Sequence, residues 1–234
     1  MPQTVVMPTW LRSHRRKLAL WGLSLFCVLP LVLVVLGRFV APPITPLMLM
    51  RMTEGEGWEQ RWVPIEAISP ELRRAVMTSE DQRFCSHHGF DWIEIDEAAE
   101  SYRDDGRVRG ASTISMQTAK NVFLWPGRNI LRKGLEAGFT VLIEALWGKR
   151  RILEVYLNVI EWGHGLYGAE AAAQHYFHRP AGALTRHQAA ALAAILPNPR
   201  RFSPTSPSLF IANRIRIIES RMGQTAMSPC LGAP

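Results

Sequence analysis

Two adjacent carboxylates, Glu80 and Asp81, begin the stretch whose residue types are best suited to proton transfer. The stretch ends at Asp91 and also holds two imidazoles and a glycine that can turn the chain. Ser69 and Pro70 are typical of a helix start, and the apolar residues after them recur on one helical face, with Glu80 at its edge. Burial against apolar residues disfavours a charged carboxylate, so we expect a raised pKa for Glu80 and a different environment for Asp81. A solvated acidic pair at a helix end is the alternative.

A second stretch, residues 109–124, predicts a helix whose first turn presents free backbone N–H groups. Ser112 and Thr113 are its two candidate N-cap residues. Such helix ends bind anions, phosphates above all, because the unpaired donors and the helix dipole act together. Gln117 and Lys120 are spaced to lie on one side of this helix, so an amide and an ammonium group can face the same ligand. An ordinary capped helix explains the two hydroxyls but not the cations that flank them.

A third group combines two cations and a carboxylate, Arg132, Lys133 and Glu136, on one helical surface. The helix is expected to begin at Asn129 and to run to about Trp147. A surface salt bridge worth a few tenths of a kcal/mol is one interpretation. The other is a carboxylate held charged by cations that also attract a phosphate.

Two later helices also carry polar residues. Glu154 and Asn158 are one turn apart on an amphipathic helix, where they either line a site or face solvent. A last helix is expected to open at Ser206, with three isoleucines inward and three arginines available to the surface: Ile211, Ile215, Ile218, Arg214, Arg216 and Arg221.

The first part of the chain predicts a membrane anchor. Residues 18–37 contain no charged side chain, and their number is close to the ~20 needed to cross a membrane. A cleaved signal peptide has a shorter apolar core and a small-residue cleavage site, which residues 38–42 do not resemble. Cations concentrate before the span, so we expect a cytoplasmic N-terminus and a catalytic domain outside. The expected division is 1–17 cytoplasmic, 18–37 transmembrane, 38–63 juxtamembrane connector, 64–222 catalytic domain and 223–234 flexible tail.

Composition limits the remaining possibilities. Of the 234 residues, 47% are apolar, and beyond the connector they recur mostly with helical period, so the domain is expected to be mostly α. The net charge of +7 favours an acidic partner, for which a lipid surface is the obvious candidate, because no nucleic-acid-binding motif is present. Only Cys85 and Cys230 could pair outside the membrane, and we expect no disulfide.

In order along the chain, four motifs resemble those of the peptidoglycan glycosyltransferases. They read Glu-Asp-x-x-Phe-x-x-His-x-Gly-x-Asp at 80–91, Gly-Ala-Ser-Thr-Ile-Ser-x-Gln-x-x-Lys-Asn at 110–121, Arg-Lys-x-x-Glu at 132–136 and Lys-x-x-Ile-Leu-Glu-x-Tyr-Leu-Asn at 149–158. The departures are Ala111, Ser115 and Met116, where the family usually has glycine, threonine and often glutamine. The chain is most similar to the monofunctional, single-span members of Gram-negative bacteria.

The resemblance implies a mostly α, lysozyme-like glycosyltransferase domain with a small membrane-proximal lobe, preceded by one transmembrane helix. It also implies elongation of glycan strands from lipid II, with release of undecaprenyl diphosphate. Glu80 would be the base that deprotonates the acceptor 4-hydroxyl. Glu136 would assist departure of the diphosphate, directly or through a divalent cation, Mg or Mn, and no organic cofactor is expected. The substrate-binding residues would be Asp81, Phe84, His87, Arg109, Gly110, Ser112, Thr113, Gln117, Lys120, Asn121, Arg132, Lys133, Glu154 and Asn158.

The resemblance also implies a location and partners. The protein would lie in the bacterial inner membrane with its catalytic domain in the periplasm, bind lipid II, the growing strand and the bilayer, and work with other cell-wall synthesis and division proteins. No nucleic acid is expected. The aromatic and apolar residues Trp92, Phe123, Leu124 and Trp125 either dip into the bilayer or pack in the core. Two other functions remain open, a membrane-anchored lysozyme-like hydrolase and a non-catalytic scaffold.

Overall fold

The structure is a computed structural model that describes Lys17, Trp21, Ser24 and residues 28–106, 110–127, 129–225 and 228–231. The chain divides into two compact units, Met1–Val40 and Ala41–Pro234. In the first unit residues 28–39 are helical. Much of the predicted span 18–37 lies outside the described residues. Among the residues that are described, no helix is both long enough and apolar enough to cross a membrane.

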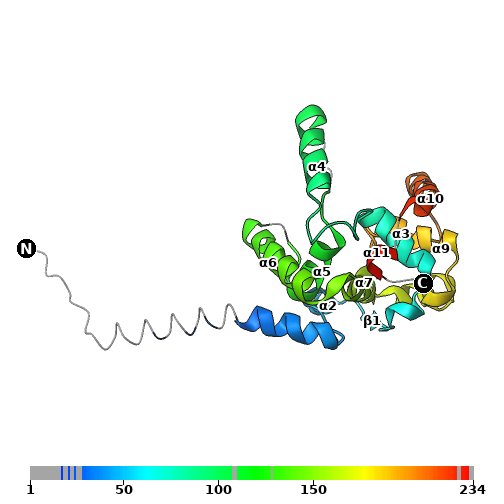
Figure 1. Cartoon of the computed structure of the whole chain (residues 1–234). Helices are drawn as coiled ribbons and strands as arrows, with labels where there is room; N and C mark the ends of the chain where they lie inside the picture. Colours follow the sequence, from blue (N-terminus) through cyan, green and yellow to red (C-terminus); the bar gives the residue numbers. More distant parts are fainter. Residues whose placement is uncertain are drawn as a thin grey trace, which may run out of the picture. The chain divides into compact units, whose positions relative to one another are not determined.

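The second unit is mostly helical, as the sequence predicted (Figure 1). Its α-helices are α2 (Pro46–Thr53), α3 (Pro70–Glu80), α4 (Trp92–Asp105), α5 (Ile114–Phe123), α6 (Ile130–Leu146), α7 (Gly148–Val159), α8 (Ala169–Phe177), α9 (Arg186–Ile195), α10 (Leu209–Arg221) and α11 (Ser228–Leu231). Short 3₁₀ helices are η1 (Ile65–Ala67), η2 (Ala181–Ala183) and η3 (Met222–Gln224). Three short strands, β1 (Glu59–Gln60), β2 (Glu161–Gly163) and β3 (Leu166–Tyr167), form a sheet in the order β1-β3-β2. Strand β3 is parallel to β1 and antiparallel to β2.

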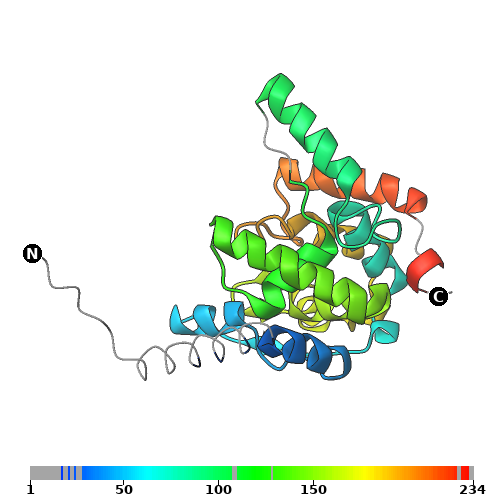
Figure 2. The same cartoon turned by 60° about the vertical axis from the view of Figure 1, so that its left-hand side comes forward.

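Helices α5, α7 and α9 lie at the centre of the packing. Helix α9 packs against α3 and α10, and α5 packs against α6 and α7. Every residue from Ala189 to Ile195 is buried, because alanine side chains let neighbouring helices approach closely. Helix α7 is buried from Ile152 to Val159 except for Glu154. Helix α4 differs from these, since Figures 1 and 2 both show it projecting from the rest of the second unit.

Local capping signals predicted the helix starts well. Ser69 accepts a hydrogen bond from the backbone N–H of Leu72 at the start of α3, with Pro70 as the first helical residue. Thr113 and Asn129 cap α5 and α6 in the same way. Helix α10 begins later than expected, because Ser208 rather than Ser206 provides its cap.

Part of the predicted connector belongs to the folded unit. Strand β1 pairs with β3, and the backbone N–H of Glu59 donates to the carbonyl of Gly165 over 2.8 Å. Gly165 has a φ of +64°, and a Cβ at this position would lie 2.2 Å from the carbonyl oxygen of Gly57. Only glycine suits both the conformation and the close approach. The boundary predicted at residues 63/64 therefore lies inside the second unit, which starts at Ala41.

The expectation of unpaired cysteines is wrong, because Cys85 and Cys230 form a disulfide with Cα atoms 5.3 Å apart. The C-terminal segment folds back onto α3, where the hydroxyls of Thr78 and Thr225 are 2.8 Å apart. Leu231 is buried, and its carbonyl accepts from Nη1 of Arg150 over 2.9 Å. The described part of this segment is thus held in place, unlike the loose tail that the sequence predicted.

Candidate functional site

A polar cavity of about 930 Å³ lies beside the end of α3. Its walls come from the end of α3 and the loop after it, from the residues that lead into α5, and from α10 and η3. Of the residues predicted to form the site, the walls include Glu80, Asp81, Gly110, Ser112, Thr113 and Gln117. The cavity therefore joins the first two sequence motifs in one place.

Glu80 is the last residue of α3 and is held by three neighbours. Gln117 donates from Nε2 to Oε2 of Glu80 over 3.0 Å, and Ser79 donates to Oε1 over 3.5 Å. On the other side, Nη2 of Arg214 lies 3.7 Å from Oε1. Burial raises the pKa of Glu80, against the opposing effects of Gln117, Arg214, Ser79 and Lys120. The predicted direction of the pKa shift is confirmed, and a carboxylate of this kind is suited to accept a proton.

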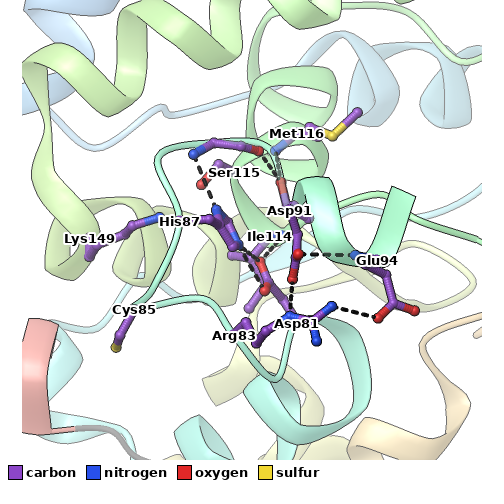
Figure 3. Close-up of polar contacts among 12 residues, drawn as sticks. Asp81, Arg83, Cys85, His87, Asp91, Glu94, Ile114, Ser115, Met116 and Lys149 are labelled. Atoms are coloured by element: carbon purple, nitrogen blue, oxygen red, sulfur yellow. Dashed lines mark hydrogen bonds and ion pairs between the residues drawn. The ribbon is translucent and has the colours of Figure 1, made fainter. Parts of the chain in front are cut away.

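Asp81 plays a different part, because it connects α3 to α5 (Figure 3). Its Oδ2 accepts from the backbone N–H of Ile114 over 2.9 Å, and both of its oxygens lie 3.0 to 3.1 Å from Nε2 of His87. Nδ1 of His87 accepts from the backbone N–H of Gly89, so the proton of the neutral ring is on Nε2 and is donated to Asp81. Thr113 in turn donates from its hydroxyl to the carbonyl of Gly89 over 2.6 Å.

The first turn of α5 is less open than the sequence predicted. Its N–H groups were expected to be free for an anion, but that of Ile114 binds Asp81 and that of Met116 binds the hydroxyl of Thr113. Most of the residues that line the cavity here precede the helix, namely Gly110, Ala111, Ser112 and the cap Thr113, and Gln117 lies within it. Positive charge near Glu80 therefore comes from side chains more than from this helix end.

Glu136 is buried between two cations, with a side chain only 3% exposed. Arg132 donates from Nη1 to Oε2 over 2.7 Å, and Lys133 bonds to Oε1. This arrangement is not the exposed surface salt bridge considered above. Lys120 connects the two regions electrostatically, because the charges of Glu136 and Glu80 both favour its protonated form. Burial has the larger effect, so the pKa of Lys120 is lowered overall.

Two sets of side chains near the motifs could be considered for a divalent cation, Glu136 and the cluster of Asp81, His87 and Asp91. Neither set suits a resident ion. Both oxygens of Glu136 are already bonded to cations. Asp81, His87 and Asp91 have ligand-type atoms within 4.8 Å of one another. However, His87 has no free lone pair, and Asp91 caps α4 and pairs with Nε of Arg83 over 2.7 Å. These three residues are thus bonded to one another and to neighbouring backbone and side-chain groups.

Other predicted residues lie away from the cavity walls. Phe84 is buried beneath Nζ of Lys149, which is 4.5 Å from the ring centre. Asn158 bonds through its amide to the backbone N–H and carbonyl of Val63. Glu154 accepts from the backbone N–H of Ile65 over 3.1 Å. Asn158 thus fastens the end of the connector to α7, and Glu154 fastens η1.

The remaining predicted residues are two polar candidates for substrate binding and four aromatic or apolar residues. Asn121 is partly buried on α5, and Arg109 lies outside the described residues. Leu124 is buried and the ring of Phe123 stacks on Phe139 at 4.5 Å, as core packing predicts. The side chains of Trp92 and Trp125 are exposed.

Among the cations of the cavity wall that the sequence interpretation missed, Arg83, Arg214 and Arg221, it is Arg214 that pairs with Glu80. Its position beside an inward isoleucine stripe indicated only that it was available to the surface. The helical period cannot specify which of the cations on α10 approaches a carboxylate on α3, since that depends on how the two helices pack.

Comparison with known proteins identifies the family. The family model described as Transglycosylase matches residues 48–223. This chain belongs to the transglycosylase family. It is 55% identical over 218 residues to a biosynthetic peptidoglycan transglycosylase of Rhodospirillum centenum, covering 93% of this chain and 92% of the relative. A protein of the same description from Caulobacter vibrioides is 53% identical over 215 residues, covering 91% of this chain and 94% of the relative.

Proposed function

We propose that this protein is a peptidoglycan glycosyltransferase that polymerises lipid II into glycan strands. The 4-hydroxyl of the acceptor sugar displaces the lipid diphosphate of the donor with inversion, and undecaprenyl diphosphate is released. Membership of the transglycosylase family and the names of the bacterial relatives support this reaction class. The observation that carries the proposal is the carboxylate of Glu80, which is only 13% exposed and has a raised pKa, in the wall of a polar cavity.

Glu80 acts as the general base in this proposal. Its carboxylate takes the proton of the acceptor 4-hydroxyl as the oxygen attacks the anomeric carbon of the donor. A base works best when its pKa is near the operating pH, and burial moves the pKa of Glu80 in that direction. Gln117 and Arg214 hold the carboxylate in place while it is charged.

Lys120, Arg132 and Lys133 neutralise the diphosphate as it leaves. Cations fixed in a partly buried site stabilise developing negative charge without reorganising during the reaction. Glu136 keeps Arg132 and Lys133 side by side and gives Lys120 a nearby negative charge. No acid is then needed at the leaving group, because a diphosphate departs as an anion.

A bacterial inner-membrane location with the catalytic unit in the periplasm is part of the proposal. The uncharged run 18–37 supports an anchor. The disulfide between Cys85 and Cys230 supports an oxidising compartment outside the cytoplasm. Exposed Trp92 and Trp125 suit a contact with the lipid interface, where the substrate resides. Other enzymes of cell-wall synthesis and division are the expected protein partners.

A glycan hydrolase is the second candidate, and the cations around Glu136 argue against it. A hydrolase of the lysozyme type needs a protonated carboxyl group to donate to the leaving sugar. Both carboxylate oxygens of Glu136 are instead bonded to cations, Arg132 and Lys133, which suit a departing diphosphate and not a leaving sugar. Asp81, the carboxylate next to Glu80, is bound to His87 and to α5.

Incubation of the purified full chain in detergent with labelled lipid II tests the proposal. We expect labelled polymer that is long enough to be cut by an added muramidase. Preformed glycan strands are the matched substrate and should keep their length. Shortening of those strands without polymer would indicate the hydrolase, and no change in either substrate would indicate the scaffold.

A further inference from the structure

A buried tyrosine lies directly behind the hydrogen bond that holds Glu80. Tyr156, on α7, is 1% exposed, and its hydroxyl donates to Oε1 of Gln117 over 3.0 Å. Gln117, on α5, donates from Nε2 to Oε2 of Glu80 over 3.0 Å. The Nε2 group also lies 3.4 Å from the carbonyl of Ser112. Tyr156, Gln117 and Glu80 thus form a chain of hydrogen bonds that spans α7, α5 and α3.

We propose that Tyr156 is a positioning residue, which keeps the Gln117 amide turned so that its Nε2–H group donates to Glu80. This inference rests on the proposed function, in which Glu80 is the base. Tyr156 is not itself in the cavity wall, so it acts through Gln117 and not on the substrate.

The orientation of the amide matters because its two ends have opposite hydrogen-bonding character. With Nε2 toward Glu80, two N–H groups face two oxygen acceptors, and Oε1 receives the hydroxyl proton of Tyr156. A flipped amide would set its carbonyl oxygen against the carboxylate of Glu80 and would leave that hydroxyl proton without its acceptor. Burial raises the pKa of Tyr156 well above its usual value, so the hydroxyl keeps its proton throughout the working pH range.

Several other groups face Glu80 directly, whereas Tyr156 is hydrogen-bonded to Gln117 and not to Glu80. Ser79 approaches from α3, Lys120 from α5 and Arg214 from α10. After burial, the negative charges of Glu80 and then Asp81 also raise the pKa of Tyr156. Among the residues that the structure describes, the hydroxyl of Tyr156 has its hydrogen bond with Gln117. The amide of Gln117 is therefore the hydrogen-bonded path by which removal of that hydroxyl reaches Glu80.

The variant Tyr156→Phe tests the inference by its pH profile. Loss of the hydroxyl lets the amide rotate, weakens the hydrogen bond to the charged form of Glu80 and raises the pKa of Glu80. The acidic limb of the profile of kcat/KM with lipid II should move to higher pH. At acidic pH kcat/KM should fall about 3- to 10-fold, as expected for a weakened bond to a charged group, with a smaller loss above neutrality. The control is Tyr176→Phe, since Tyr176 donates to the carbonyl of Trp162 and does not touch Gln117.

A double-mutant cycle shows whether Tyr156 acts through Gln117. In a Gln117→Leu background the added Tyr156→Phe change should have little further effect on the acidic limb. Additive effects would overturn the inference, as would a Tyr156→Phe profile that matches the profile of Tyr176→Phe.

A measurement that needs no activity separates this inference from the proposed function. The carboxyl carbon of Glu80 can be titrated by NMR in protein labelled with ¹³C-glutamate, with Glu80→Gln to assign the signal. A higher pKa in Tyr156→Phe than in the wild type supports the positioning role, even if the wild type made no polymer. An unchanged pKa overturns it, even if polymerisation were normal.

Discussion

Arg214 and Glu80 lie next to each other in the cavity wall, with Nη2 of the guanidinium 3.7 Å from Oε1 of the carboxylate. Glu80 ends α3 and Arg214 belongs to α10, so the contact depends on the packing of these two helices against each other and against α9. Burial raises the pKa of Glu80, and the positive charge of Arg214 limits that rise. A higher pKa makes the carboxylate a stronger base but leaves fewer molecules with the charged form that can accept a proton. Arg214 keeps the pKa of Glu80 between these two limits.

Replacement of Arg214 by methionine should move the acidic limb of the pH–rate profile upward. Without the cation the pKa of Glu80 rises further, so less of the protein carries a charged base at a given acidic pH. The profile of kcat/KM against pH is the measurement. Arg216→Gln is the matched control, since Arg216 is exposed on the same helix and bonds to Asn213. Equal profiles for the two variants would remove Arg214 from this role.

Replacement of Arg132 by methionine should cost about 3 kcal/mol in the free energy of unfolding. Glu136 would keep one cation, Lys133, but would lose its buried partner, and breaking a buried pair leaves a poorly compensated charge. Chemical denaturation measures the loss. Lys133→Met should cost about 1 kcal/mol or less, because Lys133 is exposed. A larger loss for Lys133→Met than for Arg132→Met would contradict the burial argument.

Loss of the disulfide should destabilise the fold by about 2–5 kcal/mol, because the bridge closes a long loop in the unfolded chain. Cys85 and Cys230 are 145 residues apart in sequence. Thermal unfolding of Cys230→Ser, compared with the wild type with and without reductant, measures the effect. Reductant should lower the Tm of the wild type to that of the variant and leave the variant unchanged. Insensitivity of the wild type to reductant would speak against the bridge.

Gly165→Ala should destabilise the protein by about 2–4 kcal/mol. The added Cβ would combine a left-handed backbone with a clash against the carbonyl of Gly57, where backbone and not a flexible side chain would have to move. The midpoint of urea denaturation measures this loss. Gly134→Ala is the control, because Gly134 lies within α6, a Cβ there meets nothing within 4 Å, and alanine favours the helix. Similar midpoints for the two variants would refute the close approach of Gly165 to the carbonyl of Gly57.

The features that the sequence predicted correctly depend mainly on nearby residues. Ser69, Thr113 and Asn129 cap their helices through bonds to backbone groups three residues further on. The pairing of Glu136 with Arg132 follows from helical spacing alone. The raised pKa of Glu80 followed from its place at the edge of an apolar face.

The features that the sequence did not predict depend on packing between distant segments. Arg214 approaches Glu80, Cys230 approaches Cys85, and Asn158 bonds to Val63 only once the helices are in place. Helical spacing pairs Glu136 with its cations but cannot say that the pair is buried, since burial is set by neighbouring elements. The donors at the start of α5 were predicted free because the carboxylate that occupies one of them, Asp81, comes from another motif.

The polymerisation of labelled lipid II by Glu80→Gln tests the central claim most directly. This substitution keeps the size of the side chain and removes its ability to accept a proton. We expect no polymer from the variant at any pH, while its binding to lipid II in detergent stays close to that of the wild type. Polymer formed by Glu80→Gln at a rate near that of the wild type would contradict the account, because Glu80 could then not be the base.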